Sequence, residues 1–430
     1  MERAVERCTP LAQVADLSGW MAMTAILPSV LVAGILNGSG AAPTAGAAGC
    51  PEHGGWILRD LFLPAHLCFV EDLTMKLGLG LYRHMLTPEN FRFARQAGAT
   101  HIVAHWVNYF AGTVRLPGTD GRTNWGVSDN RGKLWTYEEL RDLKNAINEH
   151  GLELAAIENL DPSHWYDILL DGPSKRDQLE DLKTIIRRLG KAGIPVLGYN
   201  FSIAGVWGHV QGHFARGEAE SVGFLGKEGP EETPIPSGQV WNMTYDAAAP
   251  PGTNGTVTSE QMWKRLADFL TEVVPVAEEA GVRLAAHPDD PPMPTLRGTA
   301  RMVYQPQLFQ RLLDIYPSHY NALEFCQGTV AEMSDGDVYE AIDKYSKQGN
   351  IAYVHCRNVK GKVPRYHEVF IDEGDVDIVR ALRIYEKNGF DGVIIPDHTP
   401  QMTCAATWHA GMAYALGYLR GVLQSFQSPV

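Results

Sequence analysis

Eight residues that can bind a metal, a proton or a sugar hydroxyl each end a short apolar run in this chain of 430 residues. In chain order they are Tyr82, His105, Glu158, Asn200, His287, Cys326, His355 and Asp397. The last four offer two imidazoles, a thiolate and a carboxylate, a mixture that suits Mn²⁺, Fe²⁺, Co²⁺ or Zn²⁺ rather than Ca²⁺ or Mg²⁺. Taken singly, a cysteine is usually buried packing and a histidine is usually a hydrogen-bonded structural group. Four such residues at four run ends favour a metal site.

These residues need a scaffold that brings the ends of distant runs together. The apolar runs are typical of strands buried on both faces, and they span residues 76–82, 100–105, 152–158, 194–200, 282–287, 321–326, 351–355 and 392–397. Amphipathic segments alternate with them, among them 137–150, 176–192, 259–280 and 376–387. This alternation predicts an α/β chain folded as a (β/α)8 TIM barrel, in which all eight strand ends gather on one face.

Three connections that leave strand ends are too long to be plain turns. They cover residues 106–134, 201–258 and 288–304. We expect these long loops at the C-terminal face of the barrel to form a lid and walls over the site.

The first 74 residues differ in composition from the rest of the chain. No charged residue occurs from Leu17 to Pro51, which is a feature of signal segments and membrane anchors. However, residues 1–7 carry no excess of positive charge, and Pro28 interrupts the apolar run. We predict a poorly ordered N-terminal extension over residues 1–74 and a barrel domain over residues 75–430. We expect a cytoplasmic protein, with export as the alternative if residues 17–50 act as a signal segment.

The composition limits the partners. The formal net charge is -13 and no cluster of Lys and Arg occurs, which argues against a nucleic-acid partner. No stable membrane association is expected. The six cysteines show no repeated spacing and therefore do not indicate a disulfide framework. A homo-oligomer is compatible with the sequence.

Short motifs around the strand ends resemble the mannonate dehydratase family. They are Gly-Tyr-Asn-Phe around Asn200, His-Pro-Asp-Asp-Pro-Pro from His287, Phe-Cys-Gln-Gly around Cys326, His-Cys-Arg-Asn from His355, Gly-Asp-Val-Asp from Gly374 and Pro-Asp-His ending at His398. The resemblance implies a xylose-isomerase-like barrel that removes water from a small sugar acid to give a 2-keto-3-deoxy product. It also implies Mn²⁺ as the cofactor, with His398 in proton transfer and with four ligands: His287, Cys326, His355 and Asp397.

The chemistry of aldonate dehydration explains why such groups are needed. Removing the proton beside a carboxylate concentrates negative charge on the carboxyl oxygens, and a divalent cation stabilises that charge. The His398 imidazole can transfer protons in the useful pH range, or it could merely orient a ligand. Arg357 could clamp the substrate carboxylate with two hydrogen bonds, or form a structural salt bridge. Asn200 could contact substrate hydroxyls or fill the barrel mouth.

The chain departs from the family pattern where the substrate would bind. The family carries Arg and Gly on the two sides of Pro-Asp-His, and this chain has Ile395 and Thr399 there. A histidine that precedes Gly-Asp-Val-Asp is replaced by Ile371, and the acid–base tyrosine of the family aligns near Thr407 and Trp408. These replacements favour a substrate other than mannonate itself.

Two other functions stay open. The first is an aldose–ketose isomerase or epimerase on the same kind of barrel, but such enzymes use carboxylate-rich metal sites, and the Cys326 thiolate speaks against it. The second is a metal-bound barrel that binds sugar acids without catalysis. Proton exchange at substrate C2 without dehydration would indicate the first, and binding without exchange would indicate the second.

Overall fold

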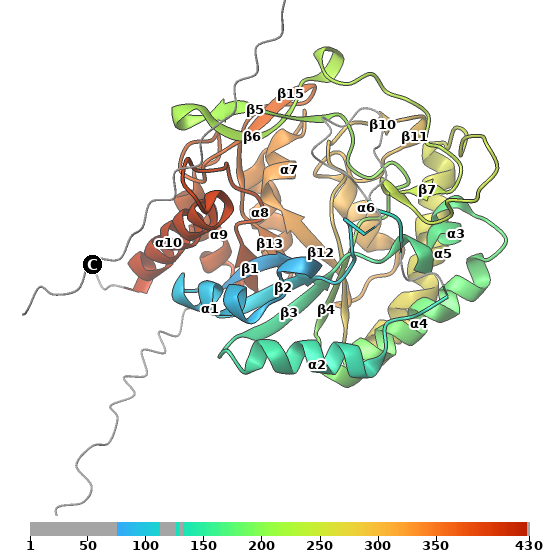
Figure 1. Cartoon of the computed structure of the whole chain (residues 1–430), viewed down its shortest axis with the longest axis horizontal. Coiled ribbons are helices and arrows are strands. Elements are labelled where there is room, and N and C mark those ends of the chain that lie inside the picture. Colours follow the sequence, from blue (N-terminus) through green and yellow to red (C-terminus); the bar gives the residue numbers. More distant parts are fainter. Residues whose placement is uncertain (1–74, 112–125, 129–131, 428–430) are drawn as a thin grey trace, which may run out of the picture. The chain divides into compact units, whose positions relative to one another are not determined.

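The computed structural model describes residues 75–111, 126–128 and 132–427, and all eight expected strands lie among them. They form a closed barrel in the order β1-β16-β13-β12-β9-β4-β3-β2, with helices around it (Figure 1). The strands are β1 Lys76–Tyr82, β2 His101–His105, β3 Glu153–Glu158, β4 Val196–Tyr199, β9 Arg283–Ala286, β12 Asn321–Cys326, β13 Ile351–His355 and β16 Val393–Ile395. The predicted (β/α)8 barrel is confirmed. The expectation for residues 1–74 lies outside the described residues.

Three of the predicted strand ends fall one or two residues beyond the observed strands. Asn200, His287 and Asp397 begin the loops that follow β4, β9 and β16. Asp397 has a φ of 64°, a left-handed conformation that cannot continue a strand and that Asp tolerates better than most residues. These side chains therefore sit at the rim of the barrel, where loop geometry rather than strand register aims them.

The helices follow the strands in the predicted alternation. Their bounds are α1 Pro88–Gln96, α2 Tyr137–Asn148, α3 Tyr166–Leu170, α4 Lys175–Ala192, α5 Ser259–Ala280, α6 Leu308–Ile315, α7 Gln327–Glu332, α8 Val338–Lys347, α9 Ile378–Lys387 and α10 Thr407–Gln427. Thr136 and Thr258 begin α2 and α5 with capping boxes. Gly193 and Gly281 end α4 and α5 with φ values of 68° and 69°. None of the described helices is both long and apolar enough to cross a membrane.

Small residues fill the middle of the barrel. Val103, Ala156, Ala285 and Ala322 belong to one buried interior cluster with Val393 and neighbouring residues. Larger side chains pack between the strands and the helices in a single core that runs around the barrel. The narrow interior layer leaves most polar side chains of the strands at the C-terminal rim, with Glu324 as a buried exception.

A second sheet covers the C-terminal face. Its strands are β5 His209–Ala215, β6 Ala219–Phe224, β14 Asn358–Lys362 and β15 Arg365–Val369, in the order β14-β15-β6-β5. Figure 1 shows β5, β6 and β15 together at the top of the view. Two hairpins complete the long loops: β7 Gln239–Val240 with β8 Met243–Thr244, in the same connection as β5 and β6, and β10 Thr295–Leu296 with β11 Thr299–Ala300 in the connection after β9. We call the four-stranded sheet the roof.

Candidate active site

A cavity of about 370 Å³ opens at the C-terminal ends of the strands. Seven of the eight strand-end residues line it: Tyr82, His105, Glu158, Asn200, His287, His355 and Asp397. Cys326, the eighth, is fully buried. The long loops contribute further wall residues, including Trp207, His209 and Asp290. The barrel therefore collects its chemically active residues around one space.

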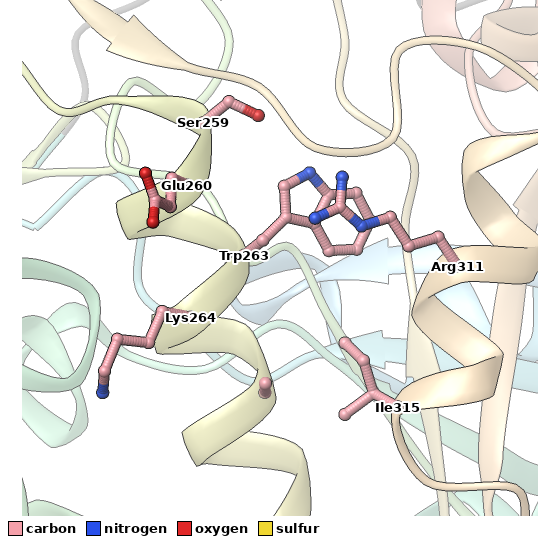
Figure 2. A pocket seen from close by; sticks show the side chains of 7 residues that line it. Ser259, Glu260, Trp263, Lys264, Arg311 and Ile315 are labelled. Carbon is pink, nitrogen blue, oxygen red and sulfur yellow. The ribbon is translucent and has the colours of Figure 1, made fainter.

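A different hollow lies on the outer side of the barrel, between α5 and α6 (Figure 2). There the guanidinium of Arg311 lies 4.1 Å from the centre of the Trp263 indole ring. The other residues that line this hollow include Ser259, Glu260 and Lys264. This hollow contains none of the candidate site residues and is a surface feature of the helix layer.

Three of the four candidate metal ligands converge. His287, Cys326 and His355 each offer a ligand atom, and these atoms all lie within 4.8 Å of one another. They come from the ends of β9, β12 and β13, which are neighbours in the barrel. A mixed sulfur and nitrogen donor set of this kind suits a first-row transition metal.

The hydrogen bonds of the two imidazoles leave one nitrogen of each ring for an ion. The Nδ1 of His287 lies 2.6 Å from the carbonyl oxygen of Pro288, so Nδ1–H donates and Nε2 is the nitrogen on which an ion could replace a proton. The Nε2 of His355 lies 3.2 Å from carboxylate oxygens of both Glu158 and Glu324, while its buried Nδ1 makes no hydrogen bond to the described residues. Metal-bound histidines commonly have their other nitrogen held in this way.

Charge also favours metal binding at this point. Burial disfavours a thiolate, but Arg357, His287 and His355 outweigh it and lower the pKa of Cys326 to about 5. Burial likewise disfavours a charged His355, but Asp397, Glu158 and Glu324 raise its pKa above its usual range. An ion bound here would therefore meet a thiolate and replace a proton on His355.

Asp397, the fourth candidate ligand, lies beside this group. Its Oδ2 is 3.5 Å from Nδ1 of His355 and 3.2 Å from Nε of Arg357. Burial opposes its charge, but His398 and His355 hold its pKa well below the usual range. The donor chemistry of all four residues fits a transition metal, and the assignment of the four as ligands stays a prediction.

Two further carboxylates lie beside the candidate metal ligands. Glu158, Glu324 and His355 form a second group whose ligand atoms lie within 4.8 Å of one another. Burial raises the pKa of Glu324 to about 8, with Glu158 adding to the effect. Burial also opposes the charge of Glu158, but His105 and His355 lower its pKa to about 2. The pair therefore holds one negative charge and one proton near neutral pH.

Glu324 was missed in the sequence analysis. It stands two residues before Cys326 on β12, so both side chains point to the same side of the strand. A single carboxylate inside an otherwise apolar strand was the available signal. Gly198 on β4 makes room for it, because a Cβ there would lie 2.4 Å from Oε2 of Glu324 and from the hydroxyl oxygen of Tyr353.

Arg357 is the centre of a buried charge cluster. Its guanidinium contacts four carboxylates: Asp290 at 2.6 Å, Asp397 at 3.2 Å, Glu368 at 3.6 Å, and Glu332. The side chain is 2% exposed and does not line the cavity. Its donors face protein carboxylates, so this placement disfavours the predicted clamp on a substrate carboxylate. A structural salt bridge, the alternative interpretation, fits these contacts.

His398 and Asn200 do line the cavity. The Nδ1 of His398 lies 2.9 Å from Oε1 of Glu368. Desolvation lowers the pKa of His398, but Asp397 and Glu368 outweigh it and raise the value to about 10. Asn200 directs Nδ2 toward the carbonyl oxygen of Pro288 at 3.4 Å, and its buried Oδ1 has no partner among the described residues.

The departures from the family pattern also lie at the cavity. Ile395, Thr399 and Trp408 line it, whereas Ile371 is buried behind it. No Lys or Arg occurs among the described residues that line the cavity. Tyrosines are present at two other places on the wall, Tyr82 and Tyr109.

The chain belongs to the mannonate dehydratase family, whose members are hydro-lyases. The family model described as D-mannonate dehydratase (UxuA) matches residues 92–224 and 253–429, which confirms the resemblance found in the motifs.

Individual relatives agree with the family. Mannonate dehydratase 2 of Halalkalibacterium halodurans is 30% identical over 294 residues, which cover 66% of this chain and 84% of that protein. Mannonate dehydratase of Thermotoga maritima is 29% identical over 305 residues, with 66% and 83% covered. The crystal structure of mannonate dehydratase from Streptococcus suis serotype 2 superposes with a TM-score of 0.64 at 25% identity, covering 82% of this chain and 93% of that one.

Proposed function

We propose that this protein is a metal-dependent dehydratase that removes water from an aldonate and releases a 2-keto-3-deoxy acid. The observation that carries the proposal is the convergence of the Cys326 thiol with one imidazole nitrogen each of His287 and His355 beside the cavity. Family membership supports the reaction type. The replaced residues at Ile395 and Trp408 support an aldonate other than mannonate.

The ion would be held by His287, Cys326, His355 and Asp397. We propose Mn²⁺, with Fe²⁺, Co²⁺ and Zn²⁺ as alternatives that the same donors accept. When bound, a divalent ion supplies a Lewis acid that stabilises negative charge on the substrate carboxyl group.

The side chains around the ion transfer protons and position the substrate. His398, held protonated by Glu368 and Asp397, donates a proton to the departing hydroxyl. His105 at the end of β2 has a pKa that burial lowers, and its neutral imidazole accepts the proton from C2. Asn200 lines the cavity, and its amide forms a hydrogen bond with a substrate hydroxyl. Arg357 positions Asp397 and Glu368 without touching the substrate.

A pair of cysteine variants tests the proposal. Purified protein with Mn²⁺ is incubated with C5 and C6 aldonates, and 2-keto-3-deoxy products and bound metal are measured. Cys326→Ser should lose both, because a hydroxyl replaces the thiolate. Cys356 is also buried, at the end of the neighbouring strand, but burial raises its pKa to about 12, so Cys356→Ser should keep both. Equal metal content in the wild type and Cys326→Ser would refute the site.

The cavity wall favours one alternative. Because the described lining contains no Lys or Arg, a neutral sugar is the second candidate substrate, in an isomerase or epimerase reaction. Aldoses and ketoses assayed in D₂O decide between the two. Deuterium at C2 of a neutral sugar, with no turnover of any acid, would favour the isomerase or epimerase.

A further inference from the structure

Trp241 stands in a backbone conformation that its side chain disfavours. It forms with Asn242 the two-residue loop between β7 and β8, and the two residues have φ values of 50° and 61°. Positive φ at both positions defines the type I′ hairpin turn, which selects Asn, Asp and Gly. A bulky residue in this region is an outlier, and such outliers gather at functional sites.

The fold holds this turn firmly in place. The Trp241 amide donates to the carbonyl oxygen of Ile203 at 2.8 Å, and the Asn242 side chain donates to the carbonyl oxygen of Val206. A Cβ on Gly205 would lie 2.9 Å from the Cα of Trp241, so only glycine permits this approach. The strained tryptophan is therefore a fixed part of the cavity wall.

Trp241 belongs to an aromatic surface on the cavity. Its ring centre lies 5.6 Å from that of Tyr109, which lies 5.9 Å from that of Tyr82, and all three residues line the cavity. Trp207 lines it too, fixed by Arg297 at 4.0 Å from its ring centre. The buried indole nitrogen of Trp207 has no hydrogen-bond partner among the described residues.

Three carboxylates line the same cavity as the aromatic surface. Glu220, Asp290 and Glu368 line the same cavity, and the described lining contains no Lys or Arg. Asp290 and Glu368 already pair with Arg357, and a wall that carries carboxylates without a lining cation disfavours a second acidic group. Aromatic faces pack against the carbon-bound hydrogens of a pyranose ring. An open-chain acid offers no such flat face. The combination is suited to a neutral sugar ring.

We propose that this side of the cavity is a subsite for a neutral pyranosyl ring attached to the aldonate, with Trp241 as the platform on which the ring stacks. The substrate would then be a glycosylated sugar acid. The proposal rests on the proposed dehydratase function. The candidate metal ligands would bind the aldonate part of the substrate, and the aromatic surface would bind the glycosyl part of the same molecule.

The test compares plain and glycosylated acids on the full chain with Mn²⁺. The probes are gluconate, mannonate, and gluconate carrying a glucopyranosyl ring on O4 through either an α or a β bond. Calorimetry measures binding and a 2-keto-3-deoxy assay measures turnover. At least one glycosylated acid should bind tenfold or more tightly than gluconate. Equal affinity for all probes would overturn the proposal.

Three variants assign the effect to the ring of Trp241. Trp241→Asn suits the turn better than tryptophan does, so the variant should fold with an unchanged or higher unfolding midpoint. It should lose at least tenfold in affinity for the glycosylated acid and little for gluconate. Trp241→Phe should keep most of the affinity. Trp263→Phe, in the outer hollow of Figure 2, is the matched control and should bind as the wild type does. Equal losses for both acids in Trp241→Asn would overturn the proposal.

The subsite and the proposed reaction fail in different ways. If gluconate or mannonate is dehydrated and no glycosylated acid binds better, the subsite is refuted and the dehydratase function stands. If glycosylated acids bind through Trp241 and no acid is dehydrated, the subsite stands and the reaction is refuted.

Discussion

The two halves of the barrel contribute different kinds of residues to one cavity. The second half, from β9 to β16, supplies ionisable groups that are buried against one another, among them Cys326, Glu324 and His355. The first half, from β1 to β4, supplies rings and amides such as Tyr82 and Asn200, together with His105 and with Glu158, which joins the ionisable group of the second half. Mutual neutralisation permits a dense cluster of charges in one half. The rings and amides of the first half take no part in that cluster, so they can differ in shape while its charges stay paired.

The sharpest test of this division is the Arg357→Ala variant. It would leave four carboxylates buried without their shared cation, which costs about 3–5 kcal/mol in the free energy of unfolding. Urea unfolding measures the loss. Arg365 is the control, because its pair with Glu228 is 62% and 69% exposed, and Arg365→Ala should cost less than about 1 kcal/mol. If the two variants lose similar amounts of unfolding free energy, the buried charge cluster around Arg357 is no more important for stability than an exposed ion pair.

Metal removal should have the next largest effect. A ligand at one hundred times its Kd stabilises the folded state by about 2.7 kcal/mol, so stripping the ion with a chelator should lower the unfolding free energy by that order. The His287→Ala protein should contain no bound metal, and its free energy of unfolding should not change when the chelator is added. A wild-type protein that is equally stable before and after chelation would show that the ionisable half folds without an ion.

A substitution in the first half can disturb the second by contact alone. Gly198→Ala on β4 would press a methyl group against Glu324 and Tyr353, and overpacking of this kind costs about 1–3 kcal/mol. Gly421→Ala in α10 is the control, since a Cβ there meets nothing within 4 Å. This control should raise stability by roughly 0.5–1 kcal/mol because alanine is the better helix former. Thermal unfolding compares the two. If Gly198→Ala unfolds at the same temperature as the wild type, the barrel interior around Glu324 and Tyr353 is less tightly packed than described.

The smallest effect is expected from shortening the chain. The described barrel begins at Met75, and its first strand pairs with β16 and β2. A chain that starts at Met75 should therefore keep its urea midpoint and its metal content. Aggregation or loss of metal would show that residues 1–74 contribute to the barrel.

The sequence predicted the barrel and most of the cavity wall because strand ends in a parallel barrel meet by geometry. It did not predict Glu324, whose place depends on side-chain alternation within β12. Nor did it predict the partners of Arg357, since Asp290, Glu332 and Glu368 come from three separate segments that only the folded chain brings together. Trp241 was missed because nothing in its neighbours in sequence marks it as a wall residue.

The roof over the cavity joins two parts of the chain that are far apart in sequence. Its two halves meet where β6 pairs with β15 through Phe224 with Tyr366 and Gly223 with His367, and these strands leave the barrel after β4 and β13. Contacts between segments so distant along the chain are slow to form, and the barrel itself closes through the still more distant strands β1 and β16. The same seam should be among the first parts to open in the native protein. Transient opening there would let a bulky substrate in while the barrel below stays closed.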